Sequence, residues 1–219
     1  DKAKIDGIEF VVADKELITN YITESKPLDN LCTSKLEGDL NHFFDNVMEN
    51  YGSWDNVGDI THWDVSQVTD MTFMFRDAEK FNQDIGNWNV GEVVTMRAMF
   101  RNAESFNQNI GSWDVKKVRV FNAMFDNATS FNGDIDKWDV RAVDVGSMFK
   151  NASSFNQNIG GWDVSQVSRG FMQGMFQNAQ SFNSDLSSWC VSLVDSEPID
   201  FAAGSALQSS YYPIWGTCP

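Results

Sequence analysis

The chain has 219 residues, 42% of them hydrophobic, and a formal net charge of −15. A chain of this length buries a sizeable core without disulfides, and its 17 Phe and 8 Trp exclude a disordered composition. The negative charge repels phosphate backbones, and the Lys and Arg residues form no cluster, which argues against nucleic acid or an anionic membrane as a partner. No apolar run reaches the ~20 residues that cross a bilayer, so we expect no direct membrane insertion.

Residues 1–30 have the pattern of an N-terminal cap. Ile8, Phe10 and Val12 alternate with polar residues, which predicts a strand. Asp14 is suited to cap a following helix, which we expect to end before Pro27. The apolar residues of this helix are Leu17, Ile18, Tyr21 and Ile22.

A tandem repeat of about 25 residues occupies residues 31–189. Its tryptophans are Trp63, Trp88, Trp113, Trp138, Trp162 and Trp189. Ile or Leu precedes each Trp by three residues, Val follows it by two, and Met-Phe and Phe-Asn pairs recur between the tryptophans. Because a period of 20–29 residues is typical of leucine-rich repeats, the pattern predicts a right-handed α/β repeat solenoid of that kind. Between Leu31 and Trp54, the Phe43-Phe44 pair indicates a degenerate first copy with a longer loop.

Within one copy, two stretches have different periods. Residues 81–85 alternate between apolar and polar, which predicts a short strand stacked in parallel on its copies at ~4.8 Å. Residues 93–103 place Val93, Met96, Met99 and Phe100 at helical spacing, which predicts a short helix on the opposite wall. An Asp or Asn follows each of the first five tryptophans, and we expect its side chain to bond backbone N–H groups in a turn. These residues are Asp64, Asn89, Asp114, Asp139 and Asp163.

The period is lost after Trp189, and we expect residues 190–219 to form a C-terminal cap over the last apolar face. Cys190 and Cys218 lie near the two ends of this segment, and a disulfide between them would close the cap. Cys32 would then be the odd cysteine, either buried or free. No two cysteines are close enough for a CxxC metal or redox motif.

Units such as SFNQNIGSWDVKKVRVFNAMFDNA resemble the BspA-like leucine-rich repeats of bacterial and mycoplasmal surface lipoproteins. The resemblance covers about residues 31–219 and includes the terminal WCVSLVDSEPIDFA and PIWGTCP segments, which look like the cap of many family members. It implies a solenoid fold, an extracellular location and a role in adhesion or partner binding. It also supports the Cys190–Cys218 disulfide, and no catalytic residue set belongs to its motif.

Catalytic chemistry has little support in the sequence. His42 and His62 are the only histidines, and neither has a convincing nucleophile or acid–base partner. His62 stands at a position that other copies fill with Asn87, Ser112 or Lys137, so we expect an exposed side chain at a tolerant position. We therefore expect no enzymatic activity and no required cofactor.

Two polar rows recur beside the Phe-Asn pair. The first row consists of Asn82, Asn107, Asn132, Asn156 and Asn183. The second row, two positions on, consists of Asp84, Asn109, Asp134, Asn158 and Asp185. For the first row we favour an internal amide ladder that satisfies backbone groups. The second row is the better candidate for binding a sugar, a peptide or calcium through its oxygens, and simple solvation of an exposed face is the alternative.

Together these features predict a secreted or cell-surface recognition module that binds an extracellular protein, peptide or glycan. It would act as a monomer or as part of a larger surface protein. The alternative is a structural spacer or stalk without its own ligand. The chain begins at Asp1 without a leader, which fits either removal of a signal peptide or a chain cut at this point.

Overall fold

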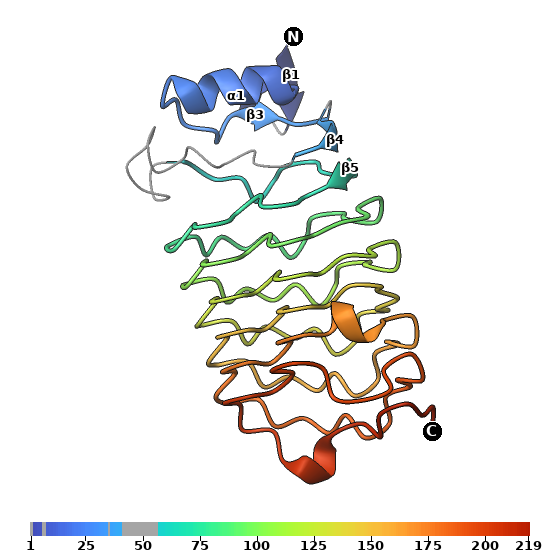
Figure 1. The fold of residues 1–219 in the computed structure, drawn as a ribbon. Coiled ribbons are helices and arrows are strands. Elements are labelled where there is room, and N and C mark those ends of the chain that lie inside the picture. Colours follow the sequence, from blue (N-terminus) through green and yellow to red (C-terminus); the bar gives the residue numbers. More distant parts are fainter. Residues whose placement is uncertain (1, 6–7, 35, 41–56) are drawn as a thin grey trace.

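The computed structural model describes residues 2–5, 8–34, 36–40 and 57–219. Figure 1 shows successive turns of chain stacked into a column, with the helix α1 at one end and the C-terminus at the other. Most of the degenerate first copy predicted before Trp54, including His42, lies outside the described residues.

A small sheet stands at the N-terminal end of the column. Strand β1 (Lys2–Ile5) pairs in antiparallel fashion with β2 (Ile8–Val12), and β2 pairs in parallel with β3 (Leu31–Cys32). The predicted strand is confirmed as β2, whereas β1 was not predicted.

The predicted N-terminal helix is confirmed as α1 (Lys15–Thr23). The backbone N–H of Leu17 donates to Oδ1 of Asp14 at 2.9 Å, so Asp14 satisfies one of the free donors of the first turn. Ile18 and Ile22 are buried one turn apart, on the face that packs into the core.

The column has a narrow parallel ladder along one edge. Strand β4 (Glu37–Asp39) pairs in parallel with β5 (Gln67–Asp70). Isolated parallel bridges continue the ladder from turn to turn: Asp70 with Thr95, Thr95 with Val120, and Val120 with Asp144. Each turn therefore contributes only a residue or a few residues to β-pairing.

The strand predicted over residues 81–85 is wrong, because this segment has no regular secondary structure. The burial alternation is real: Phe81 and Ile85 are buried, and Asn82 and Asp84 are exposed. It arises from side-chain hydrogen bonds to the backbone instead of a strand ladder, as in the bond from the backbone N–H of Asn107 to Oδ1 of Asn82 at 2.9 Å.

The helix predicted over residues 93–103 is also wrong, because tandem β-turns occupy most of it. Successive i-to-i+3 bonds run from the N–H of Met99, Arg101 and Ala103 to the carbonyls of Met96, Ala98 and Phe100. Ala98 has φ 49° and Asn102 has φ 60°, values that no right-handed helix contains. The steps of three residues imitate a helical period, which explains the misleading pattern.

These tandem turns form the backbone contact between neighbouring copies. The N–H groups of Met96, Ala98, Phe100 and Asn102 donate to the carbonyls of Val120, Asn122, Met124 and Asp126 at 3.0, 2.8, 2.9 and 2.9 Å. The same pattern repeats from copy to copy along the column. Alternate N–H groups thus point along the axis of the column, where only another copy can satisfy them.

One position in each tandem turn explains the Asn-Ala dipeptide of the repeat. It has positive φ throughout and is occupied by Asp77, Asn102, Asn127, Asn151, Asn178 and Gly204. Asn, Asp and Gly are the residues that best tolerate the left-handed region. The side chains also bond along the column, because Nδ2 of Asn127 donates to Oδ1 of Asn102 at 3.2 Å and Nδ2 of Asn178 donates to Oδ1 of Asn151 at 3.0 Å.

Two 3-10 helices occur among the described residues, one in a repeat copy and one in the C-terminal segment. The longer unit before Phe176 contains a 3-10 helix, η2 (Arg169–Phe171), and Gly174 there takes the positive-φ position that Ala98 takes in its own copy. A second 3-10 helix, η3 (Ser209–Tyr211), lies in the C-terminal segment.

Aromatic side chains fill the inside of the column. Each indole N–H of the regular copies donates to the carbonyl of the Ile in the preceding copy, as from Trp113 to Ile85 at 3.1 Å. Phe100 stacks on Phe125 with ring centroids 5.6 Å apart, and on Phe106 of its own copy at 4.0 Å. The core is therefore one continuous stack with no boundary between copies.

The C-terminal segment closes the last face of this stack. Phe201 packs edge-on against Phe176 and against Trp215, with ring centroids 5.4 and 5.1 Å apart. A disulfide joins Cys190 to Cys218, and Cys32 is a free, half-buried thiol.

Trp113→Ala should lower the free energy of unfolding by about 3–5 kcal/mol, because it leaves a cavity in the middle of the stack and removes the hydrogen bond from the indole N–H to the carbonyl of Ile85. Chemical denaturation measures the change. Val94→Ala, at a side chain in the preceding copy that is 46% exposed, is the matched control. Equal unfolding midpoints for the two variants would contradict a shared aromatic core.

At Asn127, with φ 62°, the contributions of the backbone conformation and of the side chain to the free energy of unfolding can be separated. Both Asn127→Gly and Asn127→Ala remove the side-chain hydrogen bond to Asn102. Only alanine is strained by the left-handed backbone, because glycine has no Cβ. We expect the alanine variant to be less stable than the glycine variant by about 1–2 kcal/mol in urea denaturation. An alanine variant as stable as the glycine variant would show that the left-handed position carries no strain.

Candidate functional site

The polar row, defined as Asp84, Asn109, Asp134, Asn158 and Asp185, lies on the exposed surface of five successive copies. In every member, Oδ1 accepts a hydrogen bond from the backbone N–H two residues later. These donors are Gly86, Gly111, Asp136, Gly160 and Ser187, at 3.1, 2.9, 3.1, 3.2 and 2.9 Å. Each side chain is thereby held in one orientation by its own turn.

The second polar atom of each row member points to no partner in the described part of the chain. In Asp84, Asp134 and Asp185 this atom is the acceptor Oδ2, and in Asn109 and Asn158 it is the donor Nδ2. The row therefore presents acceptors and donors alternately, one per copy, with the side chains already ordered.

Three members of the row are brought together in a shallow hollow of about 410 Å³. Asp84, Asn109 and Asp134 line it, and Asn158 and Asp185 lie outside it. Its floor is backbone: a Cβ added at Gly86 would lie 2.5 Å from the carbonyl oxygen of Asn109. Glycine at this position thus lets two neighbouring copies approach closely beneath the row.

The other wall of the hollow was missed by the sequence analysis. Asn87, Ser112 and Lys137 line it, and these are the residues immediately before each Trp. Oγ of Ser112 donates to the carbonyl of Gly86 at 2.7 Å, which fixes its position. This position was expected to be merely tolerant, although the polar residue in these three successive copies was the available signal.

Hydrogen bonds lower the pKa of two of the row carboxylates. The backbone N–H of Asp136 lowers the pKa of Asp134 below its ordinary value, with a smaller contribution from Lys137. The N–H of Ser187 lowers the pKa of Asp185 in the same way. These side chains are therefore acceptors at neutral pH and cannot donate a hydrogen bond.

The first polar row has the structural role predicted for it. The backbone N–H groups of Asn107, Asn132, Asn156 and Asn183 donate to Oδ1 of the Asn one copy earlier at 2.8–2.9 Å. Gln208 of the C-terminal segment donates to Asn183 in the same way, at 3.0 Å. The predicted amide ladder that satisfies backbone groups is confirmed, but it is not internal, because Asn82, Asn107, Asn132 and Asn156 are exposed.

The turn role predicted for the Asp or Asn after each Trp is confirmed in four copies. Asp64, Asn89, Asp114 and Asp163 accept from the backbone N–H two residues later, at 3.0–3.3 Å. Asp139 instead pairs with the guanidinium of Arg141, at 2.9 Å.

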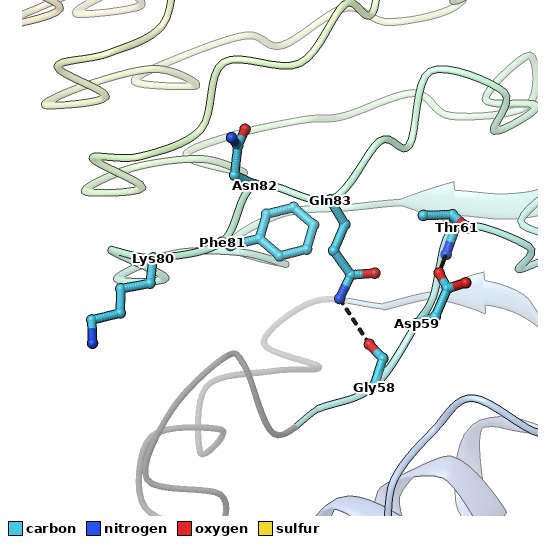
Figure 2. A pocket seen from close by; sticks show the side chains of 7 residues that line it. All are labelled: Gly58, Asp59, Thr61, Lys80, Phe81, Asn82 and Gln83. Carbon is cyan, nitrogen blue, oxygen red and sulfur yellow. Dashed lines mark hydrogen bonds between the residues drawn. The ribbon is translucent and has the colours of Figure 1, made fainter.

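A second hollow, of about 590 Å³, is lined by Gly58, Asp59, Thr61, Lys80, Phe81, Asn82 and Gln83, and Gln83 points toward Gly58 there (Figure 2). Its polar groups bond to one another: Nε2 of Gln83 donates to the carbonyl of Gly58 at 2.7 Å, and the N–H of Thr61 donates to Oδ1 of Asp59 at 2.8 Å. The polar row remains the candidate, because it recurs in five successive copies.

No group of three or more His, Cys, Asp or Glu side chains suited to a metal occurs among the described residues. Asp84 and Asp134 are two copies apart, with Asn109 between them, so one calcium ion cannot share their carboxylates. His62 is exposed, as predicted, and its Nε2 lies 3.0 Å from the carbonyl oxygen of Leu31.

The profile of a family described as "Mycoplasma protein of unknown function, DUF285" matches residues 38–146 and 143–213. The chain belongs to the DUF285 family. The matched residues include all six tryptophan copies and most of the C-terminal segment. No match was found among curated proteins or solved structures, so the leucine-rich-repeat class and the BspA-like relationship stay predictions.

The pKa values of Asp134 and Asp126 should be shifted in opposite directions from the ordinary value of an Asp side chain. The pKa of Asp134 is lowered by its backbone hydrogen bond, so its contribution to stability exists above the unfolded-state pKa of ~3.9 and is lost as the pH falls through the folded value. Burial raises the pKa of Asp126, so its contribution exists below the unfolded pKa and is lost as the pH rises through the folded value.

Carbon NMR of the carboxyl groups across a pH titration measures both midpoints, with Asp134→Asn and Asp126→Asn assigning the two signals. We expect the lower midpoint at Asp134. The reverse order would contradict the hydrogen bond from Asp136 or the burial of Asp126.

Proposed function

We propose that this DUF285 protein is an extracellular recognition or adhesion module that binds a protein, peptide or glycan through the polar row. One observation carries the proposal. Each row member has a second polar atom without a hydrogen-bond partner in the described part of the chain, and its side chain is held in place by its own turn. Ordered side chains lose less entropy when a ligand binds.

The wider architecture favours the same function. An extended partner could contact several copies at once, because equivalent residues recur along one face of the column. We further propose that the stacked turns are a leucine-rich-repeat-like solenoid of the BspA type displayed at a cell surface, either alone or within a longer protein. Membership of the DUF285 family supports this location. In the described part of the chain, no helix is long and apolar enough to span a bilayer.

A structural spacer is the second candidate function. The continuous Phe and Trp stack and the closed C-terminal face favour it, because they make a stiff rod regardless of what the surface binds. The two functions differ in one respect: a spacer tolerates changes in the polar row, and a binder does not.

The combined variant Asp84→Ala, Asn109→Ala and Asp134→Ala tests the binding function. On arrays of glycans, peptides and extracellular proteins, we expect wild type to bind at least one probe and to show a ligand-dependent rise in melting temperature. The triple variant should lose most of this binding, because three ordered polar groups are removed from one hollow.

The matched control is Asp64→Ala, Asp114→Ala and Asp163→Ala, which removes three caps of the same geometry that do not line the hollow. It should keep wild-type binding with a similar loss of stability. If wild type binds a probe and both triple variants bind it equally well, the polar row is not the binding site. The spacer function then gains support.

A further inference from the structure

One copy of the amide ladder carries an Asn-Gly pair, Asn132-Gly133, and Asn132 is the only asparagine of the sequence that is followed by glycine. At the same position in other copies, Gln follows Asn82, Asn107 and Asn156. The side chain of Asn132 is exposed, so water reaches its amide. Glycine has no Cβ that would hinder attack of its backbone nitrogen on the preceding side chain, which gives this pair a chemistry that the other copies lack.

The reaction open to such a pair is loss of ammonia through a succinimide. The backbone nitrogen of Gly133 loses its proton to water or hydroxide and forms a bond to Cγ of Asn132. The bond from Cγ to Nδ2 then breaks, and the side-chain nitrogen takes up a proton and leaves as ammonia. Water opens the succinimide at either of its carbonyl carbons, which leaves aspartate or isoaspartate at position 132. No oxidant or reductant is needed.

Two hydrogen bonds of the ladder favour the attack. Oδ1 of Asn132 accepts from the backbone N–H of Asn156 at 2.9 Å and from Nε2 of Gln157 at 3.0 Å. Both donors point at the oxygen that gains negative charge when Cγ is attacked, so they stabilise that charge as an oxyanion hole does. The N–H of Gly133 has no acceptor in the described part of the chain, so the attacking nitrogen is not held by another group. We propose that Asn132 is a site of spontaneous deamidation, assisted by these two donors from the next copy.

The two products affect the ladder differently. Aspartate keeps both oxygens on the side chain, so one of them still accepts from the N–H of Asn156. In isoaspartate the main chain runs through Cγ and is longer by one atom, and the oxygen that served the ladder becomes a peptide carbonyl. Phe131 and Ile135 on either side are buried in the core and resist this lengthening. Isoaspartate therefore weakens the contact between this copy and the next.

Incubation of the full chain at neutral and at mildly alkaline pH, followed by peptide mapping with mass spectrometry, tests the site. Asn82 is the matched position, because its Oδ1 accepts from the N–H of Asn107 and from Nε2 of Gln108 in the same way, but glycine does not follow it. We expect Asn132 to deamidate at least about tenfold faster than Asn82. The rate should rise with pH, because the attacking nitrogen must lose a proton. Equal conversion at the two positions, or none at Asn132, overturns the proposal.

Gln157→Met tests the assistance by the ladder. It removes the bonds from Nε2 to Oδ1 and to the backbone carbonyl of Asn132, and it should slow deamidation there by about 3–10-fold. Gln108→Met is the matched control, because it removes the equivalent two bonds to Asn82 and should leave the rate at Asn132 unchanged. A Gln157→Met chain that deamidates as fast as wild type, or faster, shows that the donors do not assist.

Amide hydrogen exchange tests the consequence for the ladder, after chromatography has separated the aspartate and isoaspartate forms of the aged chain. In the isoaspartate form, the N–H of Asn156 should exchange at least about tenfold faster than in wild type, whereas the N–H of Asn107, which bonds to Asn82, should exchange as before. Asn132→Asp provides the authentic aspartate form and should keep wild-type exchange at Asn156. Equal exchange in the two aged forms contradicts a weakened ladder. None of these outcomes depends on the proposed binding function.

Discussion

The bond between the backbone N–H of one copy and the carbonyl of the next is the interaction on which the whole molecule depends. Tandem β-turns leave alternate N–H groups, such as those of Ala98 and Phe100, unsatisfied within their own copy. Only a neighbouring copy at a fixed distance can pair them. These bonds hold neighbouring copies side by side, which stacks the Phe and Trp rings inside the column and aligns the polar row on its surface.

The Asn and Asp residues of the repeat have two different roles. Those inside the ladders, such as Asn107 and Asn127, use their side chains to join one copy to the next. Those of the polar row, such as Asp84 and Asp134, accept a backbone hydrogen bond from their own turn, and their second polar atom has no partner in the described part of the chain. The first kind stabilises the column, whereas the second costs little in stability and is free to select a ligand.

A good part of this could be anticipated from the residues. The repeat unit, the buried columns, the cap at Asp14 and the amide ladder through Asn82 all follow from burial periodicity and from the preference of short polar side chains for turns. The strand over residues 81–85 and the helix over residues 93–103 were wrong, because side-chain bonding and tandem turns produce the same spacings as these regular elements.

The sequence by itself determined two things: that the chain is built from copies of about 25 residues, and which residues are buried. Both follow because the buried positions are occupied by hydrophobic residues in every copy. Only the tertiary structure decided where the backbone bonds go, and that Asn87, Ser112 and Lys137 share a hollow with Asp84, Asn109 and Asp134. The reason is physical: a surface row exists only when copies distant in sequence lie side by side, and the distance between them is fixed by bonds that no single copy contains.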